Sequence, residues 1–234
     1  MKIALIGYGA MGRLFHELAG ERGHQAEAVA HEADAALTAH ELSERVGPAD
    51  VVIDFSVAAA VRRNVEACVM ADVPVIEGTT GWNSEMEEIR GVVETRNGAF
   101  VYGANFSIGV NLFYRIAGHA AELFAKFPEY ETFIEEQHHS RKRDAPSGTA
   151  LKIKDFVTKH VPVGDIAATR AGNIPGTHRL GFDGPADQVL LQHTARSREG
   201  FAIGALMAAE WIIGKKGFYE FTDVMDEMIG AREP

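Results

Sequence analysis

The sequence predicts an α/β protein, with a parallel β-sheet covered by helices on both faces, followed by a second, α+β region. Two observations support this fold class. Through the first hundred residues, short apolar runs mostly alternate with helical patterns, and the runs are continuously apolar, which is typical of strands buried on both faces. After Asn105 this alternation stops, and longer helical patterns and Gly/Pro-rich segments take its place.

The first region is expected to build the parallel sheet. Its apolar runs predict strands at residues 2–6, 27–30, 51–55, 73–77 and 99–102. Apolar residues at helical spacing predict helices at 11–22, 58–71 and 84–95. Strand–helix–strand units of this kind join parallel strands, because a parallel pair needs a long crossover connection.

The second region combines helices with fewer strands. Helices are expected at 110–127, 148–160, 201–213 and 223–229. The runs 130–137 and 188–193 are β-like. Residues 162–185 are rich in Gly and Pro, and we interpret them as a loop with at most a short strand at 180–182.

The charge balance argues against two classes of partner. The 234 residues include 23 basic and 33 acidic side chains, a net charge of −10. Non-specific nucleic-acid binding and anionic membranes both need clustered cations. The single cysteine, Cys68, excludes an intrachain disulfide, and neither a signal peptide nor a membrane-spanning run is recognisable. We therefore expect a cytoplasmic protein that binds no nucleic acid and no membrane.

A glycine-rich turn follows the first predicted strand. Residues 7–12 fit the pattern G-x-G-x-x-G between a strand and a helix. The first glycine permits a tight turn, the second lets a pyrophosphate approach the backbone, and the third lets helix and strand pack closely. This context predicts a Rossmann-type dinucleotide site, with a ligand-free turn as the alternative. The candidate cofactor-binding residues here are Gly7, Tyr8, Gly9, Ala10, Met11 and Gly12.

Three more segments are candidates for the cofactor site. After the second strand, Glu32 is placed to bind the ribose of NAD, but His31 precedes it and can accept the 2′-phosphate of NADP. The sequence therefore leaves NADH versus NADPH open. Loops after the fourth and fifth strands lie at the sheet edge where doubly wound folds bind ligands. They add Gly78, Thr79, Thr80, Gly103, Ala104, Asn105 and Phe106, for which ordinary turns are the alternative.

The stretch 135–153 gathers cations in an acidic chain. If residues 130–139 are extended, His138 and His139 point to opposite faces unless the strand ends between them. Lys142 lies four residues beyond His138. Cations beside an imidazole that donates a proton near neutral pH suit a small dianionic substrate. The alternatives are solvated histidines and a solvated basic run at 141–143.

A helix start follows these cations. Ser147 is a good N-cap, so the N–H groups of Gly148 and Thr149 lie in the first turn and predict a carboxylate-binding site. The two adjacent histidines are also half of a metal site. No cysteine or carboxylate is recognised at ligand spacing to complete it, so we expect no metal.

The same residues resemble a known family. Segment 138–150, HHSRKRDAPSGTA, matches every fixed position of the pattern H-H-x-x-K-x-D-A-P-S-G-T-A of the dihydrodipicolinate (4-hydroxy-tetrahydrodipicolinate) reductases. The glycine turn and segments 78–81, 105–111, 170–178 and 193–205 are similar to other signatures of that family, so the resemblance covers nearly the whole chain. Gln137 and Arg143 depart from it outside the fixed positions, and the His31-Glu32 junction is less typical.

The resemblance implies a reaction and an assembly. Family members reduce cyclic 4-hydroxy-tetrahydrodipicolinate to tetrahydrodipicolinate with NADH or NADPH, in diaminopimelate and lysine biosynthesis. His138 is then the proton donor and Lys142 the second catalytic residue. The residues implied to bind the dianionic substrate are His139, Ser147, Gly148 and Thr149. Two domains that close over the substrate and a homotetramer built on the second domain's sheet are also implied.

The resemblance also implies domain bounds. Residues 1–108 and 202–234 form the dinucleotide-binding domain, and 109–201 form the substrate-binding and tetramerisation domain. Two rival interpretations stay open. Another Rossmann dehydrogenase of amino-acid metabolism has no reason to carry segment 138–150, and a non-enzymatic NAD(P)-sensing module would bind cofactor without turnover.

Overall fold

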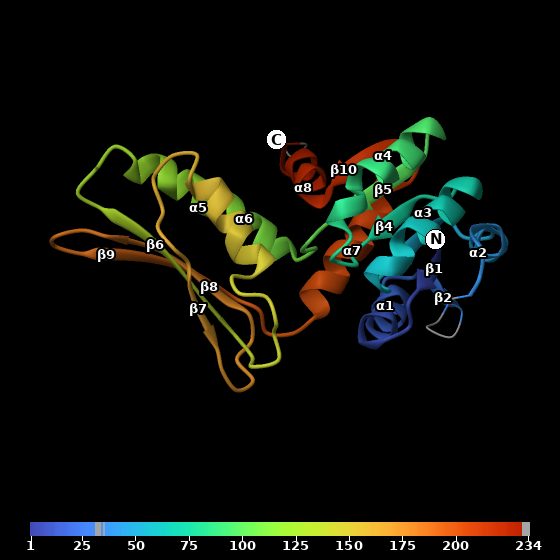
Figure 1. Ribbon diagram of the computed structural model, residues 1–234, viewed down its shortest axis with the longest axis horizontal. Helices are drawn as coiled ribbons and strands as arrows, with labels where there is room; N and C mark the ends of the chain where they lie inside the picture. Colours follow the sequence, from blue (N-terminus) through green and yellow to red (C-terminus); the bar gives the residue numbers. More distant parts are fainter. Residues whose placement is uncertain (31–33, 35, 231–234) are drawn as a thin grey trace. The chain divides into compact units, whose positions relative to one another are not determined.

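The computed structural model describes residues 1–30, 34 and 36–230. The chain forms two compact units, which we call unit 1 (Met1–Ser107 with Phe201–Pro234) and unit 2 (Ile108–Gly200). Each unit has its own β-sheet and its own hydrophobic core (Figure 1).

Unit 1 contains, within the described residues, a six-stranded parallel sheet with the strand order β10-β5-β4-β3-β1-β2. Its strands are β1 (Lys2–Ile6), β2 (Gln25–Ala30), β3 (Val51–Asp54), β4 (Val75–Glu77), β5 (Ala99–Tyr102) and β10 (Gly217–Glu220). Neighbouring residues such as Val52 and Ile53 are both buried although they point to opposite faces. The sheet is therefore covered on both faces, which explains the continuous apolar runs.

Helices connect these strands. They are α1 (Ala10–Glu21), α2 (Ala39–Val46), α3 (Val61–Met70), α4 (Met86–Thr95), α7 (Glu199–Ile212) and α8 (Phe221–Gly230), with 3-10 turns η2 (Ala58–Ala60) and η3 (Asn83–Glu85). One core cluster joins the sheet to α2, α3 and α4 through Leu42, Val65 and Ile89. A parallel sheet with helices on both faces is the doubly wound arrangement, so the predicted α/β class is confirmed for this unit.

Unit 2 packs helices on one face of a mixed sheet with the strand order β7-β6-β8-β9. Its elements are α5 (Ile108–Phe124), β6 (Glu131–His138), α6 (Gly148–Val157), β7 (Ala167–Arg170), β8 (Thr177–Asp183) and β9 (Gln188–Thr194). Helices α5 and α6 lie side by side (Figure 1) and bury Phe113, Ile153 and Leu180 in a second core. The predicted α+β region is confirmed.

Three short elements, α2, β7 and β10, were not predicted from the sequence. Helix α2 begins at a capping box in which Thr38 Oγ1 accepts the Glu41 N–H at 3.2 Å and the Glu41 carboxylate accepts the Thr38 N–H at 2.8 Å. Strand β7, and a β8 longer than expected, contradict the loop predicted for 162–185. Strands β7 and β10 are four-residue edge strands, and they are ordered by pairing with β6 and β5.

We find no helix among the described residues with the length and apolar character needed to cross a membrane.

Candidate active site

The glycine turn after β1 has the geometry that its motif requires. Gly7 adopts a φ of +86°, and a Cβ there would lie 2.6 Å from the Phe55 carbonyl oxygen. A Cβ on Gly12 would lie 2.3 Å from the Gly7 carbonyl oxygen, so α1 can pack this closely only with glycine. Gly9 is the N-cap of α1, is exposed and has open space where its side chain would be. The turn therefore leaves room for an anion at the start of α1, beside Ala10 and Met11.

The other two candidate loops lie at the same sheet edge. Residues 78–80 follow β4 and residues 103–106 follow β5, and in a parallel sheet the carboxyl ends of β1, β4 and β5 share one edge. Thr80 and Ala104 are exposed there, and Tyr8, Thr79 and Asn105 are half-buried.

Phe106 and Glu32 stand apart from this group. The Phe106 ring is only 2% exposed and packs against Phe55 and Phe221, so only its backbone can face a ligand. Glu32 and His31, the candidates for the ribose and the 2′-phosphate, lie outside the described residues.

In unit 2, strand pairing assembles a polar cluster around Glu136. Glu136 lies opposite His178 of β8 in the antiparallel register, and His138 lies opposite Arg170 of β7 in the parallel register. Since Glu136 and His138 are two residues apart on β6, they share a face. Glu136 is 1% exposed, His138 8% and His178 4%. We call Glu136, His138, Ser147, Arg170 and His178 the Glu136 cluster.

The Glu136 carboxylate receives most of the hydrogen bonds in this cluster. The Ser147 N–H donates to Oε1 at 2.9 Å, the Ser147 hydroxyl donates to Oε2, and the Arg170 guanidinium donates to Oε1 at 2.5 Å. His138 Nδ1 and His178 Nε2 lie 3.4 and 3.6 Å from Oε2. The carboxylate therefore ties the end of β6 to the start of α6 and to β7.

These contacts set the ionisation of the cluster. Burial alone would raise the pKa of Glu136, but the hydrogen bonds from Ser147 and the charge of Arg170 lower that pKa below its ordinary value. Burial lowers the pKa of His138, with Glu136 opposing the shift and Lys142 adding to it. Burial and the neighbouring His138 lower the pKa of His178 to about 4. At neutral pH the cluster therefore contains an ionised carboxylate, a guanidinium and a neutral His178.

The residues after β6 form the turn and helix start that the sequence predicts. Strand β6 ends at His138, so His139 begins the turn and is free of the strand's alternation. Ser147 is the N-cap of α6 and accepts the Ala150 N–H at 3.2 Å. Gly148 is exposed, has open space where a Cβ would be, and stands with Thr149 in the first turn.

Asp144 fills part of this predicted anion site. Its carboxylate lies 2.8 Å from Lys142 Nζ and also accepts the Gly148 N–H. Burial would raise the pKa of Asp144, but the hydrogen bond from Lys142 lowers it below the ordinary value. The Asp144 carboxylate thus binds the Gly148 N–H, which the sequence predicts for a substrate carboxylate, and Lys142, which is predicted as the second catalytic residue.

The expectation that no carboxylate completes a metal site needs correction. Glu136, His138 and His178 bring one ligand atom each to within 4.8 Å of one another. Glu136 lies two residues before His138 on the same face of β6, so it completes this set through strand alternation rather than through a ligand-spacing motif. The Arg170 guanidinium already supplies a positive charge to the Glu136 carboxylate, the charge that a metal ion would otherwise supply.

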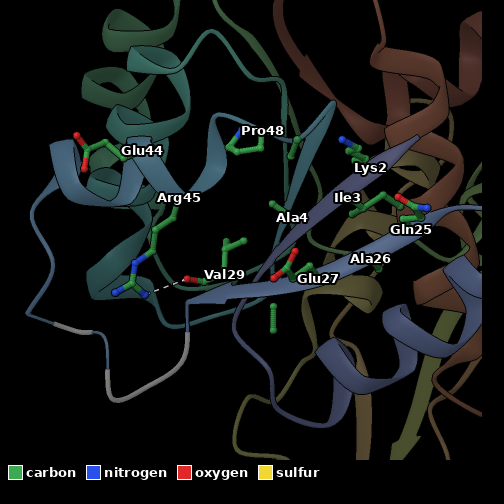
Figure 2. Close-up of a pocket in the computed structure, with 12 residues that line it drawn as sticks. Lys2, Ile3, Ala4, Gln25, Ala26, Glu27, Val29, Glu44, Arg45 and Pro48 are labelled. Carbon is green, nitrogen blue, oxygen red and sulfur yellow. Dashed lines mark hydrogen bonds between the residues drawn. The ribbon is translucent and has the colours of Figure 1, made fainter.

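A separate pocket lies away from all these residues. Its volume is about 740 Å³, and Figure 2 shows it lined by β1, by the edge strand β2 and by the end of α2. Arg45 donates to the Val29 carbonyl oxygen at 3.2 Å on its wall. None of the described candidate residues lines this pocket, so it adds nothing to the candidate site.

Comparison with known proteins settles the family. The family model described as "Dihydrodipicolinate reductase, N-terminus" matches residues 1–106, and the one described as "Dihydrodipicolinate reductase, C-terminus" matches residues 109–225. The chain belongs to the dihydrodipicolinate reductase family. The resemblance stated from the sequence is thereby confirmed, membership makes the chain an oxidoreductase, and the family's Rossmann-type domain implies a nicotinamide cofactor.

Relatives in this reductase family match most or nearly all of the chain. The 4-hydroxy-tetrahydrodipicolinate reductase of Christiangramia forsetii is 35% identical over 97% of this chain and 99% of its own length. That of Archaeoglobus fulgidus is 36% identical over 76% of each chain. The solved structure of a dipicolinate-bound dihydrodipicolinate reductase from Paenisporosarcina sp. TG-14 has a TM-score of 0.74, 22% identity and coverage of 96% and 99%, which supports the fold.

Part of the Glu136 cluster was not predicted from the sequence. Glu136, Arg170 and His178 received no role, although Arg170 and His178 lie in a segment similar to the family's signatures. The period-2 alternation of β6 was sufficient to place Glu136 beside His138. Nothing local could place Arg170 and His178, because they lie 34 and 42 residues beyond Glu136 in the sequence. Only the pairing of β7 and β8 with β6 brings them to it.

Proposed function

We propose that this chain reduces 4-hydroxy-tetrahydrodipicolinate to tetrahydrodipicolinate with NADH or NADPH, in the pathway to diaminopimelate and lysine. The observation that carries the proposal is the Glu136 cluster, which holds a buried imidazole, His138, on the strand that leads into the Lys142 turn and the start of α6. The family and the names of its members supply the substrate class.

Unit 1 is proposed to bind the cofactor. The open space at Gly9 and the close packing at Gly12 fit a dinucleotide pyrophosphate at the start of α1. When bound, a reduced nicotinamide supplies the hydride. The loops 78–80 and 103–106 are proposed to line the same site, and Glu32 to contact the ribose. We propose that either NADH or NADPH serves.

In unit 2, His138 is proposed to donate the proton that accompanies the hydride. A general acid must reach the substrate and hold a proton near the working pH. Burial lowers the pKa of His138, whereas Glu136 raises it, and a dianionic substrate would raise it further. We therefore propose that substrate binding itself charges His138, with Lys142 as the second catalytic residue.

The substrate's carboxylates are proposed to bind at His139, Ser147, Gly148 and Thr149 together with Lys142. Asp144 now pairs with Lys142 and Gly148, and its side chain is 54% exposed. An exposed ion pair contributes at most about 1 kcal/mol, so a substrate carboxylate can displace it at little cost. Asp144 then acts as a replaceable occupant of the site.

The proposal extends to assembly and location. Strand β9 is an edge strand of unit 2, and its Val189 and Leu190 are 39% and 46% exposed. An exposed apolar edge of this kind favours contact with further copies, and we propose a cytoplasmic homotetramer built on this sheet. Sedimentation velocity tests the assembly, and a Leu190→Asp variant that still sediments as a tetramer would remove β9 from the interface.

A coupled assay tests the function. The preceding synthase generates the substrate from pyruvate and aspartate semialdehyde, and the loss of NADH and NADPH absorbance is followed in parallel. We expect oxidation that requires both enzymes, and the two specificity constants give the cofactor preference. Cofactor binding without any turnover would instead favour the NAD(P)-sensing interpretation.

A His138→Gln variant tests the site within this assay. The loss of the proton donor is expected to lower kcat by at least about a hundredfold while NAD(P)H affinity stays unchanged. His119→Gln is the matched control, because His119 is also in unit 2 but its side chain is 70% exposed. An unchanged kcat in His138→Gln would remove His138 from the mechanism.

A further inference from the structure

Two buried carboxyl groups lie side by side in unit 1. Asp54 ends β3 and Glu77 ends β4, and the two residues are direct partners in the parallel register. Partners in a parallel pair point to the same face, and neighbouring strands are about 4.8 Å apart. Both residues are 0% exposed. We call Asp54 and Glu77 the acid pair.

The donors around the acid pair are unevenly divided. Asp54 accepts the Ser56 N–H at 3.0 Å and the Asn64 side-chain amide at 2.7 Å. Glu77 accepts the Thr79 N–H at 2.6 Å through Oε1. Within the described part of the chain, no N–H or O–H donates to Glu77 Oε2, although this atom is buried. A buried acceptor without a donor is costly, so this oxygen needs an explanation.

No cation compensates the two acids directly. Among the described residues, no ion pair involves Asp54 or Glu77. Arg63 on α3 is linked to them through Asn64, whose amide oxygen accepts a hydrogen bond from the Arg63 guanidinium at 2.8 Å. From the same helix the buried Cys68 thiol also faces the pair, and burial and both acids raise its pKa. On β5, the partner of Glu77 is Tyr102, whose pKa responds to burial and to Glu220 instead.

A single proton would account both for the Glu77 Oε2 atom that lacks a donor and for two buried acids that, among the described residues, lack a paired cation. Two ionised carboxylates held together in a dry core repel each other strongly, as in other paired acids that share a proton. A proton on Glu77 Oε2 removes that repulsion and gives this oxygen a hydrogen-bond partner in Asp54. Asp54 is the better place for the charge, because two N–H donors already point at it and Arg63 polarises one of them.

We propose that Asp54 and Glu77 share one proton, carried by Glu77, and that this acid pair positions the loops of the cofactor site. The second part rests on the proposed function. The Ser56 and Thr79 N–H groups bond to the pair's carboxyl groups, and the Gly78 and Gly103 N–H groups bond to its backbone carbonyls at 2.9 and 3.2 Å. Ser56 N–H also donates to Thr79 Oγ1 at 3.0 Å, which links two loops directly.

The directions of the pKa shifts of Glu77 and Asp54 support the shared proton. Burial raises the pKa of Glu77 well above its ordinary value, and the neighbouring Asp54 raises it further. Burial also raises the pKa of Asp54, but hydrogen bonds from Ser56 and Asn64 oppose the rise. Loss of the proton at alkaline pH leaves two buried negative charges that repel each other. Movement that relieves this repulsion would displace the loops whose Ser56 and Thr79 N–H groups bond to the acid pair.

Infrared spectroscopy tests the proton without any assay of activity. The wild-type chain at neutral pH is expected to show the C=O stretch of a protonated carboxyl group, shifted in D2O. Glu77→Gln should remove this band, whereas Glu94→Gln, which changes a 59% exposed carboxylate on α4, should keep it. No band in the wild-type chain, or a band that persists in Glu77→Gln, overturns the shared proton.

Cofactor titration tests the positioning. In the wild-type chain, the Kd for NADPH is expected to weaken as the pH rises into the alkaline range. The amide of Glu77→Gln can still donate to Asp54, so its Kd should stay within about threefold of wild type at neutral pH and show no alkaline weakening. Glu77→Leu leaves Asp54 without that donor and should weaken binding about tenfold or more at every pH.

The two parts of the proposal fail separately. Equal alkaline weakening in the wild-type chain and Glu77→Gln overturns the role of the acid pair in positioning. If the wild-type chain binds no NAD(P)H at any pH, the positioning role fails together with the proposed function, while the infrared spectrum still decides the shared proton. A Glu77→Gln variant that does not fold leaves the wild-type band as the deciding measurement.

Discussion

Glu136 in unit 2 and the acid pair in unit 1 are all buried carboxyl groups, but their neighbours differ. Glu136 has a guanidinium within 2.5 Å and hydrogen bonds from the Ser147 N–H and hydroxyl. Asp54 and Glu77 have backbone and amide donors but no directly paired cation among the described residues. A buried carboxyl group is therefore neutralised by Arg170 in one unit and by a proposed proton in the other.

The two solutions suit different tasks. An ionised Glu136 keeps a negative charge beside His138 and so favours a protonated imidazole there, which a proton donor needs. A protonated pair carries less charge beneath loops that are proposed to bind an anionic cofactor. The two regions should also respond to pH in opposite directions, because the pKa of Glu136 is lowered and that of Glu77 is raised.

The largest effect is expected from removing Arg170, the cation that pairs with Glu136. Arg170→Met leaves a buried carboxylate without its ion pair, and we expect the free energy of unfolding to fall by about 3–5 kcal/mol. Urea denaturation measures this loss. The double variant Glu136→Gln with Arg170→Met removes the charge as well and should recover most of the stability.

Arg179→Met is the matched control for this measurement. Arg179 is also on unit 2, but its side chain is 31% exposed and its partner Glu135 is 42% exposed. Its removal should cost less than about 1 kcal/mol. Equal losses in Arg170→Met and Arg179→Met would show that Glu136 is as well solvated as a surface acid.

The next largest effect is the dependence of stability on pH in the acid range, which differs between the two regions. His178 has a pKa of about 4 in the folded chain against an ordinary 6.5, so between these values the unfolded chain binds more protons. Stability is therefore expected to fall by about 3 kcal/mol as the pH falls from 6.5 to 4, and the lowered pKa of Glu136 extends the loss below 4.5. The raised pKa of Glu77 acts in the opposite direction, since its contribution is present in acid and is lost as the pH rises.

Denaturation midpoints measured across this pH range check the assignment. His178→Gln should flatten the dependence between pH 6.5 and 4, and His119→Gln should leave it intact, because His119 is exposed. If His178→Gln keeps the full wild-type slope, the acid loss belongs to other groups.

The sequence predicted the parts of both regions that depend on local pattern. Continuous apolar runs placed β1, β3, β4 and β5, and the glycine turn placed the start of α1. The Pro-Ser-Gly-Thr run placed the N-cap Ser147 and the first turn of α6. In each case the determinant lies within a few residues of the element that it specifies.

The sequence could not show what register alone brings together. Arg170 and His178 reach Glu136 because β7 and β8 pair with β6 on either side, and β7 itself is a short edge strand inside a segment rich in Gly and Pro. The acid pair depends in the same way on the alignment of β3 with β4. Asp54 and Glu77 look ordinary in the sequence, since each simply ends an apolar run at the point where loops begin.

A smaller effect is expected from Asp144, an exposed carboxylate that contrasts with both buried regions. Asp144→Asn removes the charge that pairs with Lys142 and with the Gly148 N–H. If Asp144 is a replaceable occupant, dipicolinate should bind up to about fivefold more tightly, as expected from an exposed ion pair of about 1 kcal/mol. Calorimetric titration with dipicolinate measures the change. Weaker binding would show that Asp144 orients Lys142 rather than competing with the ligand.

The smallest expected effect concerns how tightly each region is packed. In unit 1, a Cβ on Gly12 would meet a backbone oxygen at 2.3 Å, which cannot yield, whereas in unit 2 a Cβ on Gly176 would lie 3.1 Å from His138 Nε2. Gly176→Ala should therefore shift only the imidazole, lower kcat several-fold and change the free energy of unfolding by less than about 1 kcal/mol. Gly164→Ala, where the added Cβ meets open space, is the control. An unchanged kcat in Gly176→Ala would mean that the proposed proton donor tolerates displacement of its ring.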